Sequence, residues 1–123
     1  MAKCDKTVAV IGVSLDETKY GFSIFRDILA QNCKVYGINP KGGTILEQKI
    51  YPSLADLPEV PQLVITVVPP AATEAIVDEC IKLGINTIWM QPGSESDAAI
   101  DKAKAAGIAV TARACFMVKF GFW

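Results

Sequence analysis

The sequence predicts an α/β fold in which a doubly wound parallel sheet of about five to six strands carries helices on both faces. Its short candidate strands are continuously apolar rather than alternating, which is typical of strands buried on both sides. Segments with helical periodicity stand between them. Because such alternation gives right-handed crossovers and an open sheet, and because 123 residues suit one unit, residues 1–123 are predicted to form a single Rossmann-like domain.

The first half of the chain predicts two strands and one helix. Residues 7–13 form a β-rich apolar run with Gly12 near its end. Residues 34–38 form a second strand, which the following Asn-Pro pair stops because proline donates no ladder hydrogen bond. Residues 41–44 are expected to be a loop. Four apolar side chains between the two strands indicate an amphipathic helix: Ile24, Phe25, Ile28 and Leu29.

The second half predicts three further strands and two helices. One helix begins at Ala72 and ends at Gly84, and the next is capped by Ser94 or Ser96 and ends at another glycine. Residues 52–58 indicate a single helical turn with Ser53 as its N-cap. The three apolar runs that read as strands are 63–68, 86–90 and 108–111.

Composition and charge exclude several classes of function. The formal net charge of -1 gives no electrostatic basis for binding nucleic acid or an anionic membrane. No apolar run reaches the roughly 20 residues that a membrane span needs, and the first residues lack a signal-type apolar region, so a cytoplasmic location is expected. The chain has no histidine, which removes Ser-His and Cys-His catalysis and the commonest metal ligand.

The four cysteines are scattered along the chain, at Cys4, Cys33, Cys80 and Cys115. They include no close pair of the kind that structural zinc sites use. The chain has enough apolar residues to fold without a disulfide framework. We therefore expect free thiols and predict no metal site.

The loop after the first strand is a candidate phosphate site. In doubly wound folds, ligands bind in the crevice at the carboxyl ends of the strands. Gly12, Val13 and Ser14 turn the chain toward a helix that opens near Gly21, where unsatisfied amides and the helix dipole favour an anion. Ser14 adds a hydroxyl and Lys19 a positive charge. The alternative is that the glycines only allow close packing of the helix on the strand.

The loop after the second strand narrows the class of nucleotide. Folds that bind NAD usually carry an acid here for the ribose hydroxyls, whereas this chain has Asn39, Pro40 and Lys41. A lysine favours an additional ribose phosphate, which coenzyme A has at its 3′ position and NADP at its 2′ position. The alternative is that Lys41 is only a solvated loop residue.

The third core strand ends in a Pro-Pro pair, at Pro69 and Pro70. Two prolines have no amide donors, so with Val68 they form an apolar wall that suits an adenine face or a pantetheine arm. They also suit the first turn of a helix, and the two interpretations remain open.

These segments together resemble a known family. Their order and spacing, from the first strand to about Met117, are similar to those of the small stand-alone CoA-binding proteins, relatives of the CoA-binding domain of the succinyl-CoA synthetase alpha subunit. The segments that carry the resemblance are 12–14 (GVS), 19–21 (KYG), 38–41 (INPK), 51–58 (YPSLADLP), 68–70 (VPP), 89–91 (WMQ), 105–107 (AAG) and 113–117 (RACFM).

The resemblance implies a coenzyme A site in three parts. The pyrophosphate would meet the first loop, at Gly12, Val13, Ser14, Lys19, Tyr20 and Gly21. The adenosine ribose and its 3′-phosphate would meet the second, at Ile38, Asn39, Pro40 and Lys41. The nucleotide or pantetheine would meet Val68, Pro69 and Pro70, with Gln91 and Cys115 on the same rim, where Cys115 could approach the CoA thiol.

Two departures from the family pattern lie near the last strand. Pro92 follows Gln91 where an apolar residue is usual, and Ala112 and Ala114 stand where an acid and a basic residue are commoner. For Cys115 the alternative is an inert, small hydrophobic side chain.

The predicted function is therefore the binding of coenzyme A or an acyl-CoA, a small-molecule ligand, without evident catalysis and with no catalytic residue assigned. The first alternative is an NADP-dependent reductase or a redox protein acting through Cys115, so enzymatic activity is left open. A second alternative is a regulatory or scaffold subunit, a possible homo-oligomer, acting through the apolar and aromatic tail at residues 116–123.

Overall fold

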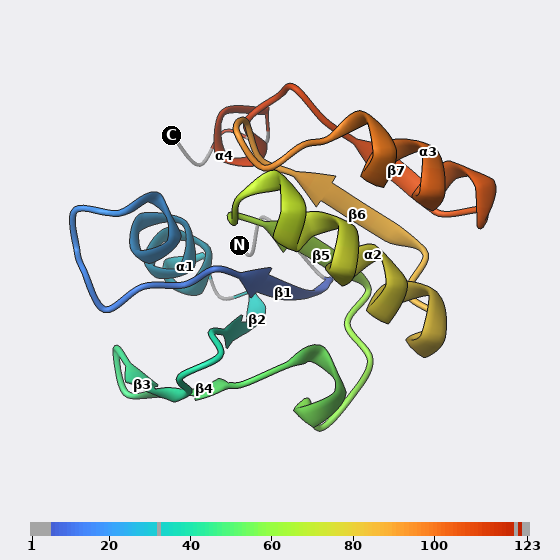
Figure 1. Ribbon diagram of the computed structural model, residues 1–123. Helices are drawn as coiled ribbons and strands as arrows, with labels where there is room; N and C mark the ends of the chain where they lie inside the picture. Colours follow the sequence, from blue (N-terminus) through green and yellow to red (C-terminus); the bar gives the residue numbers. More distant parts are fainter. Residues whose placement is uncertain (1–5, 32, 120, 122–123) are drawn as a thin grey trace.

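The computed structural model describes residues 6–31, 33–119 and 121, which form a seven-stranded sheet with helices on both faces (Figure 1). This confirms the predicted α/β fold. The strands are β1 (Thr7–Ile11), β2 (Lys34–Ile38), β3 (Gly43–Ile45), β4 (Gln48–Tyr51), β5 (Leu63–Thr66), β6 (Thr87–Met90) and β7 (Ala109–Thr111). The helices are α1 (Tyr20–Ala30), α2 (Pro70–Leu83), α3 (Asp97–Ala105), α4 (Phe116–Lys119) and the 3₁₀ turn η1 (Leu54–Asp56).

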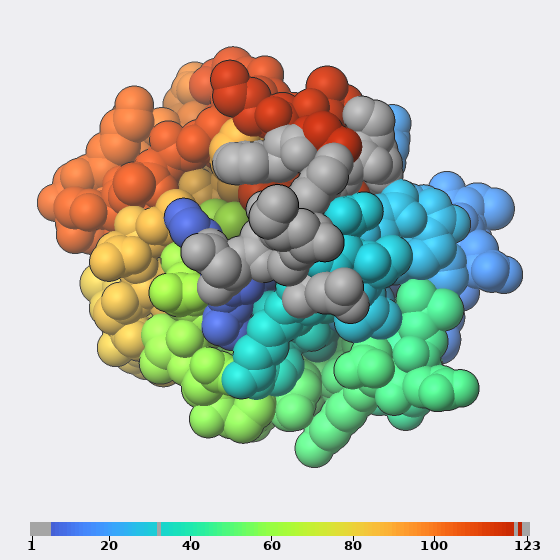
Figure 2. All heavy atoms as spheres, turned by 180° about the vertical axis from the view of Figure 1, so that it is seen from behind, coloured from blue at the N-terminus to red at the C-terminus, as the bar shows by residue number. Residues whose placement is uncertain are grey.

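The strand order is β3-β4-β2-β1-β5-β6-β7, and every neighbouring pair is parallel except β3 and β4. Seen from behind, the β3–β4 hairpin and the α3–β7 segment lie on opposite sides of the molecule (Figure 2). The chain passes from β1 to β2 on one side and later to β5 on the other. The order therefore reverses at β1, and the loops after β1 and β5 flank the crevice where such folds bind ligands.

Successive residues of the central strands enter two separate cores. On one face, Val8 and Val10 pack with α1 and with Phe116 and Met117 of α4. On the other face, Ala9 packs with side chains of α2 and α3. Strands buried on both sides are continuously apolar, which is why this pattern predicted the sheet.

The sheet has more strands than predicted because residues 41–44 are not all loop. Gly43–Ile45 is β3, which pairs with β4 in a hairpin closed by Leu46 and Glu47. Both turn residues have positive φ, 52° and 65°, as a type I′ turn requires. Such turns are usually Asn-Gly or Asp-Gly, and Leu-Glu gives no such signal, so the prediction of a loop was wrong.

The predicted helix ends are partly confirmed. Gly84 closes α2 with φ 75°, and Ser96, rather than Ser94, caps α3 by accepting a hydrogen bond from the amide of Ala99. The turn at η1 is present, but the Ser53 side chain makes no N-cap hydrogen bond and instead donates to the carboxylate of Asp56 at 2.9 Å.

The expectation of free thiols holds for two of the described cysteines. Cys80 and Cys115 are free, whereas Cys33 is disulfide-bonded to a partner outside the described residues. In the predicted apolar tail, Phe116 and Met117 are buried against the sheet, while residues 120, 122 and 123 lie outside the described part of the chain. No helix among the described residues has the length and apolar character needed to cross a membrane.

Candidate functional site

Four cavities open along the carboxyl edge of the sheet, around the loops that leave β1, β2, β5 and β6. The first, of about 270 Å³, lies between the β1 and β2 loops. The second, of about 240 Å³, lies between these loops, η1 and α2. The third, of about 420 Å³, lies over the β5 and β6 loops, and the fourth, of about 370 Å³, lies between α1, β6 and α4. Val68 is shared by the second and third cavities, and Val67 and Pro92 by the third and fourth, so these three cavities form a path.

The two glycines of the first loop are required for close packing. A Cβ on Gly12, where φ is +105°, would lie 2.2 Å from the Val67 carbonyl oxygen. A Cβ on Gly21 would lie 2.0 Å from the Gly12 carbonyl oxygen. Only residues without a side chain allow β1, the β5 loop and α1 to approach this closely, so close packing is one role of these glycines, and a role toward an anion stays a prediction.

The protein itself uses several amides of the first loop. The amides of Gly12 and Val13 both donate to the Ile38 carbonyl, at 3.0 and 3.3 Å, and are therefore not bare. The amides of Gly21 and Phe22 have no acceptor among the described residues, and Lys19 provides no side-chain cap to α1. Donors for an anion thus remain in the first turn of the helix rather than at the glycine turn.

The first cavity brings together Ser14, Asn39 and Lys41, three of the predicted site residues. The Asn39 amide nitrogen donates to the Val13 carbonyl at 2.8 Å, and its oxygen accepts from the Lys41 amide at 2.9 Å. Asn39 therefore joins the β1 and β2 loops and fixes the backbone that carries Lys41. The Ser14 hydroxyl accepts from the Asp16 amide at 3.0 Å, which leaves its own proton available to donate.

Asp16 is an acid on the wall of this cavity that the sequence analysis did not single out. Hydrogen bonds from the hydroxyl and the amide of Thr18 hold the pKa of the Asp16 carboxyl below its ordinary value. The carboxylate therefore stays ionised, but it is occupied by Thr18. An anionic ligand in this cavity would have to lie on the side of Ser14 and Lys41, away from Asp16.

The second cavity is mainly apolar. Its walls include Ile38 and Pro40 on one side and Val68 and Ile76 on the other, and Glu79 is its one acidic residue among the described lining. An apolar slot between two loops suits a flat ring better than a phosphate, because a buried phosphate would lack donors there. Leu54 of η1 also lines this cavity and is nearly fully buried.

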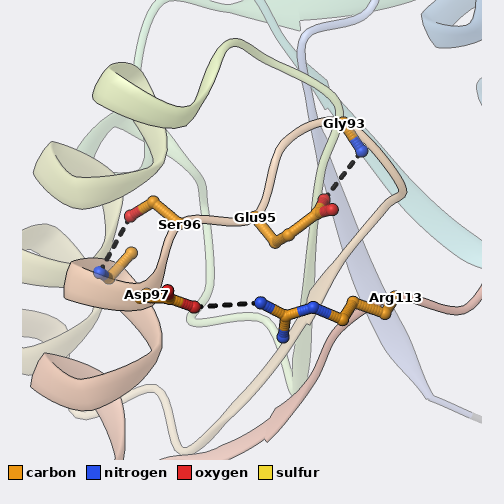
Figure 3. A network of polar contacts seen from close by, with 6 residues as sticks. Gly93, Glu95, Ser96, Asp97 and Arg113 are labelled. Carbon is orange, nitrogen blue, oxygen red and sulfur yellow. Dashed lines mark hydrogen bonds and ion pairs between the residues drawn. The ribbon is translucent and has the colours of Figure 1, made fainter.

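The loop after β6 makes polar contacts that involve two acidic residues, Glu95 and Asp97 (Figure 3). The Glu95 carboxylate accepts from the Gly93 amide at 2.7 Å, and Arg113 donates to Asp97 at 2.9 Å. The Ser94 hydroxyl lies 2.7 Å from the Thr66 hydroxyl, and both side chains are buried. Since the Gly93 amide is occupied by a carboxylate, this loop is unsuited to a phosphate but remains open to a neutral chain.

The fourth cavity contains Gln91 and Cys115 together with Tyr20, which the predictions had placed near the pyrophosphate loop. The Gln91 amide nitrogen donates to the Cys115 sulfur at 3.4 Å. The Trp89 ring nitrogen donates to the Ala114 carbonyl at 2.7 Å, which holds the segment before α4 against β6. β6 therefore positions Gln91, which follows it directly, and through Trp89 it also holds the segment that carries Cys115.

The structure thus brings most of the predicted residues to one edge. Val13 and Gly21 are buried, and Lys19 is exposed and lines none of the four cavities. Pro69 and Pro70 begin α2, which confirms the helix-start interpretation of the Pro-Pro pair; both also line the third cavity, and their contact with a nucleotide or pantetheine stays a prediction. The sequence analysis did not single out several residues that line these cavities: Leu15, Asp16, Leu54, Ile76, Glu79 and Val118.

Comparison with known proteins gives a consistent result. The family model described as "CoA binding domain" matches residues 6–121. Among solved structures, a conserved hypothetical protein from Pyrococcus furiosus is 31% identical with a TM-score of 0.88, covering 93% of this chain and 98% of that chain. A hypothetical protein from Pyrococcus horikoshii is 30% identical with a TM-score of 0.90, covering 94% of this chain and 82% of that one.

The curated relatives are much longer proteins. An ADP-forming acetate–CoA ligase from Archaeoglobus fulgidus is 35% identical over 99 residues, which are 80% of this chain and 14% of the relative. One from Methanocaldococcus jannaschii is 38% identical over 80 residues, which are 65% of this chain and 11% of the relative. The chain therefore spans only a small part of the length of these ligases.

Proposed function

The chain belongs to the family of CoA binding domains, and on this premise we propose that it binds coenzyme A along the carboxyl edge of its sheet, without a catalytic step of its own. The observation that carries the proposal is the order of chemistry along this edge. A serine hydroxyl and a lysine lie in the first cavity, an apolar slot lies beside it, and a largely neutral path leads to the fourth cavity.

The phosphates fit the first loop and the first cavity best. Ser14 donates its hydroxyl, the amides at the start of α1 face an anion, and Lys41 meets the 3′-phosphate. The adenine ring fits the slot between Pro40 and Val68. The pantetheine arm then passes the third cavity. Its amides are neutral, so the nearby Glu95 carboxylate does not repel them as it would repel a phosphate.

The test compares coenzyme A with 3′-dephospho-CoA by isothermal titration, using wild type and Lys41→Gln. We expect coenzyme A to bind about fivefold more tightly, which corresponds to about 1 kcal/mol for a solvent-exposed charge-assisted hydrogen bond. Lys41→Gln should remove this difference and leave dephospho-CoA binding unchanged.

Lys6 provides the matched control, because it is an exposed lysine that precedes β1 at the opposite edge of the sheet. Lys6→Gln should leave both affinities unchanged. A folded protein that gives no heat with millimolar coenzyme A, or that binds NADPH in its place, contradicts the proposal.

Three finer points remain predictions. The relatives named above are acetate–CoA ligases, and the kinship with succinyl-CoA synthetase expected from the sequence is not tested by them. A cytoplasmic location and a homo-oligomeric state are likewise expectations. The whole-enzyme activity of the ligases is not proposed for this chain, which covers so little of their length.

A further inference from the structure

The fourth cavity is larger and more apolar than the thiol group at the end of the coenzyme A pantetheine arm would require. It holds about 370 Å³ and lies between the start of α1, the end of β6 and α4. Ile24, Val67 and Val118 form aliphatic walls, and Tyr20 lies at its mouth. Tyr20 and Val118 are exposed large hydrophobic side chains, at 70% and 62%. Apolar side chains on both sides of an opening suit a ligand that brings hydrocarbon with it.

Gln91 gives this cavity a fixed hydrogen-bond donor. Its side-chain oxygen accepts from the Phe116 amide at 2.7 Å. A backbone amide only donates, so the orientation of the Gln91 side chain is determined, and the nitrogen must face Cys115. That nitrogen carries two protons, of which one goes to the Cys115 sulfur, and the second has no acceptor among the described residues.

The second proton therefore calls for an acceptor from a ligand. Gln91 is only 5% exposed, so solvent is a poor source of one. A thiol sulfur is a weak acceptor, whereas a carbonyl oxygen is a strong one. The carbonyl of a thioester, followed by hydrocarbon, matches both the buried donor and the aliphatic walls beyond it.

Resting on the proposed coenzyme A site, we propose that the fourth cavity binds the acyl end of a short-chain acyl-CoA of about four to six carbons. The thioester oxygen accepts from the Gln91 amide nitrogen, and the acyl chain lies against Ile24, Val67 and Val118. The step is binding only, and no bond to Cys115 forms.

The position along the sheet is compatible with this arrangement. β1, β5 and β6 are consecutive strands of the sheet. At about 4.8 Å between strands, the β6 loop lies about 10 Å from the β1 loop. The shared lining residues Val67, Val68 and Pro92 give the connecting arm a continuous surface between phosphate loop and cavity.

The experiment measures dissociation constants by isothermal titration at 150 mM salt for coenzyme A, acetyl-CoA, butyryl-CoA and hexanoyl-CoA. We expect affinity to rise about two- to fourfold for each methylene added beyond acetyl-CoA, because each one leaves water. Equal affinity for coenzyme A and all three acyl-CoAs overturns the inference and leaves the proposed function standing. No binding of any of them overturns both.

Variants at Val118 test the location of the acyl group. Val118 is exposed, so Val118→Asp should fold, and its charge beside the hydrocarbon should weaken butyryl-CoA about tenfold. Coenzyme A should change less than twofold, since the phosphates lie beyond the screening length of about 8 Å. Val118→Thr, which has the same shape without a charge, is the matched control and should change butyryl-CoA binding much less. Equal weakening of coenzyme A and butyryl-CoA by Val118→Asp contradicts this location.

A variant at Gln91 tests the donor itself. Gln91→Met keeps the length and loses the amide, and it should lower the ratio of butyryl-CoA affinity to coenzyme A affinity about five- to tenfold. Circular dichroism checks that it folds, because Gln91 also holds the Phe116 amide. An intact-mass increase of the protein by the butyryl group would show transfer to a protein nucleophile and overturn the binding-only proposal.

Discussion

Replacing Gly12 by alanine tests the close approach on which the geometry of the first loop depends. The added Cβ would lie 2.2 Å from the Val67 carbonyl oxygen and 2.9 Å from Val68 Cγ1. Overpacking of this kind costs about 1–3 kcal/mol. The backbone at φ +105° adds roughly 1–2 kcal/mol, since it disfavours any residue with a Cβ. We therefore expect Gly12→Ala to lower the free energy of unfolding by about 2–5 kcal/mol.

Gly43 provides a closely matched control. Its φ is +104°, and a Cβ there would meet nothing within 4 Å. Gly43→Ala therefore carries the backbone cost alone, and the difference between the two variants isolates the collision with the β5 loop. Urea unfolding at 25 °C measures both, with equal slopes required for the comparison. If the two variants are destabilised equally within 0.5 kcal/mol, the close contact between Gly12 and Val67 is refuted.

Three further predictions concern stability. Burial, helped by the nearby Glu79, raises the pKa of the Cys80 thiol to about 12 from 9.0. Above pH 9 the unfolded chain therefore loses a proton that the folded protein keeps, and stability falls by up to about 1.4 kcal/mol per pH unit. Urea midpoints at pH 8–10 should show a shallower fall for Cys80→Ala, and an unchanged fall contradicts this. Asn-Gly in place of Leu46 and Glu47 should raise the free energy of unfolding by about 1 kcal/mol in thermal unfolding, because both positions have positive φ; no gain would count against the turn type. Ser96→Ala should lower it by about 1 kcal/mol through loss of the α3 cap, while Ser96→Asp, which keeps an acceptor, should not.

The sequence predicts the central sheet well because burial on both faces leaves a strong local pattern. In β1 and β5 every residue from Val8 to Ile11 and from Leu63 to Thr66 is buried, so both strands are continuous apolar or β-branched runs. The helices on either face can likewise be predicted, from the spacing of their apolar residues and from Gly84, which ends α2. Where the hydrophobic pattern of a segment alone determines its secondary structure, a single sequence is sufficient to predict that element.

The edge hairpin was not predictable, since its pattern is not local. Leu46 and Glu47 adopt left-handed backbone conformations, although neither is one of the residues (Asn, Asp or Gly) that usually occupy such a turn. The strand β3 is only three residues long and mostly exposed, so it has little hydrophobic signal. Its position depends on pairing with β4, which in turn pairs with Gly37 and Ile38 of β2. Only the assembled sheet specifies it.

The candidate site was predictable in its loops but not in its cavities. The order of strands brings the segments after β1, β2, β5 and β6 to one edge, and loops of that kind can be found in the sequence. The wall formed by Ile76 and Leu54 comes from the side of α2 and from η1, and nothing local distinguishes these residues from core positions. Likewise, Val118 lines the fourth cavity from α4, whose preceding segment is held on β6 by Trp89.

The structure separates two roles within the candidate phosphate loop. The sequence analysis placed unsatisfied amides at the start of the helix near Gly21, and in the structure the amides of the glycine turn before it, Gly12 and Val13, both donate to the Ile38 carbonyl. These two hydrogen bonds join the end of β1 to the end of β2, and the loops that follow carry Ser14 and Lys41 to the first cavity. In the proposed coenzyme A complex the glycine turn therefore acts by positioning, and the start of α1, the Ser14 hydroxyl and Lys41 supply the contacts to the phosphates. Salt screens exposed charges, over about 8 Å at physiological ionic strength. Coenzyme A affinity that depends on exposed lysines should therefore fall as the salt concentration rises. Affinity that depended on buried amides would barely change.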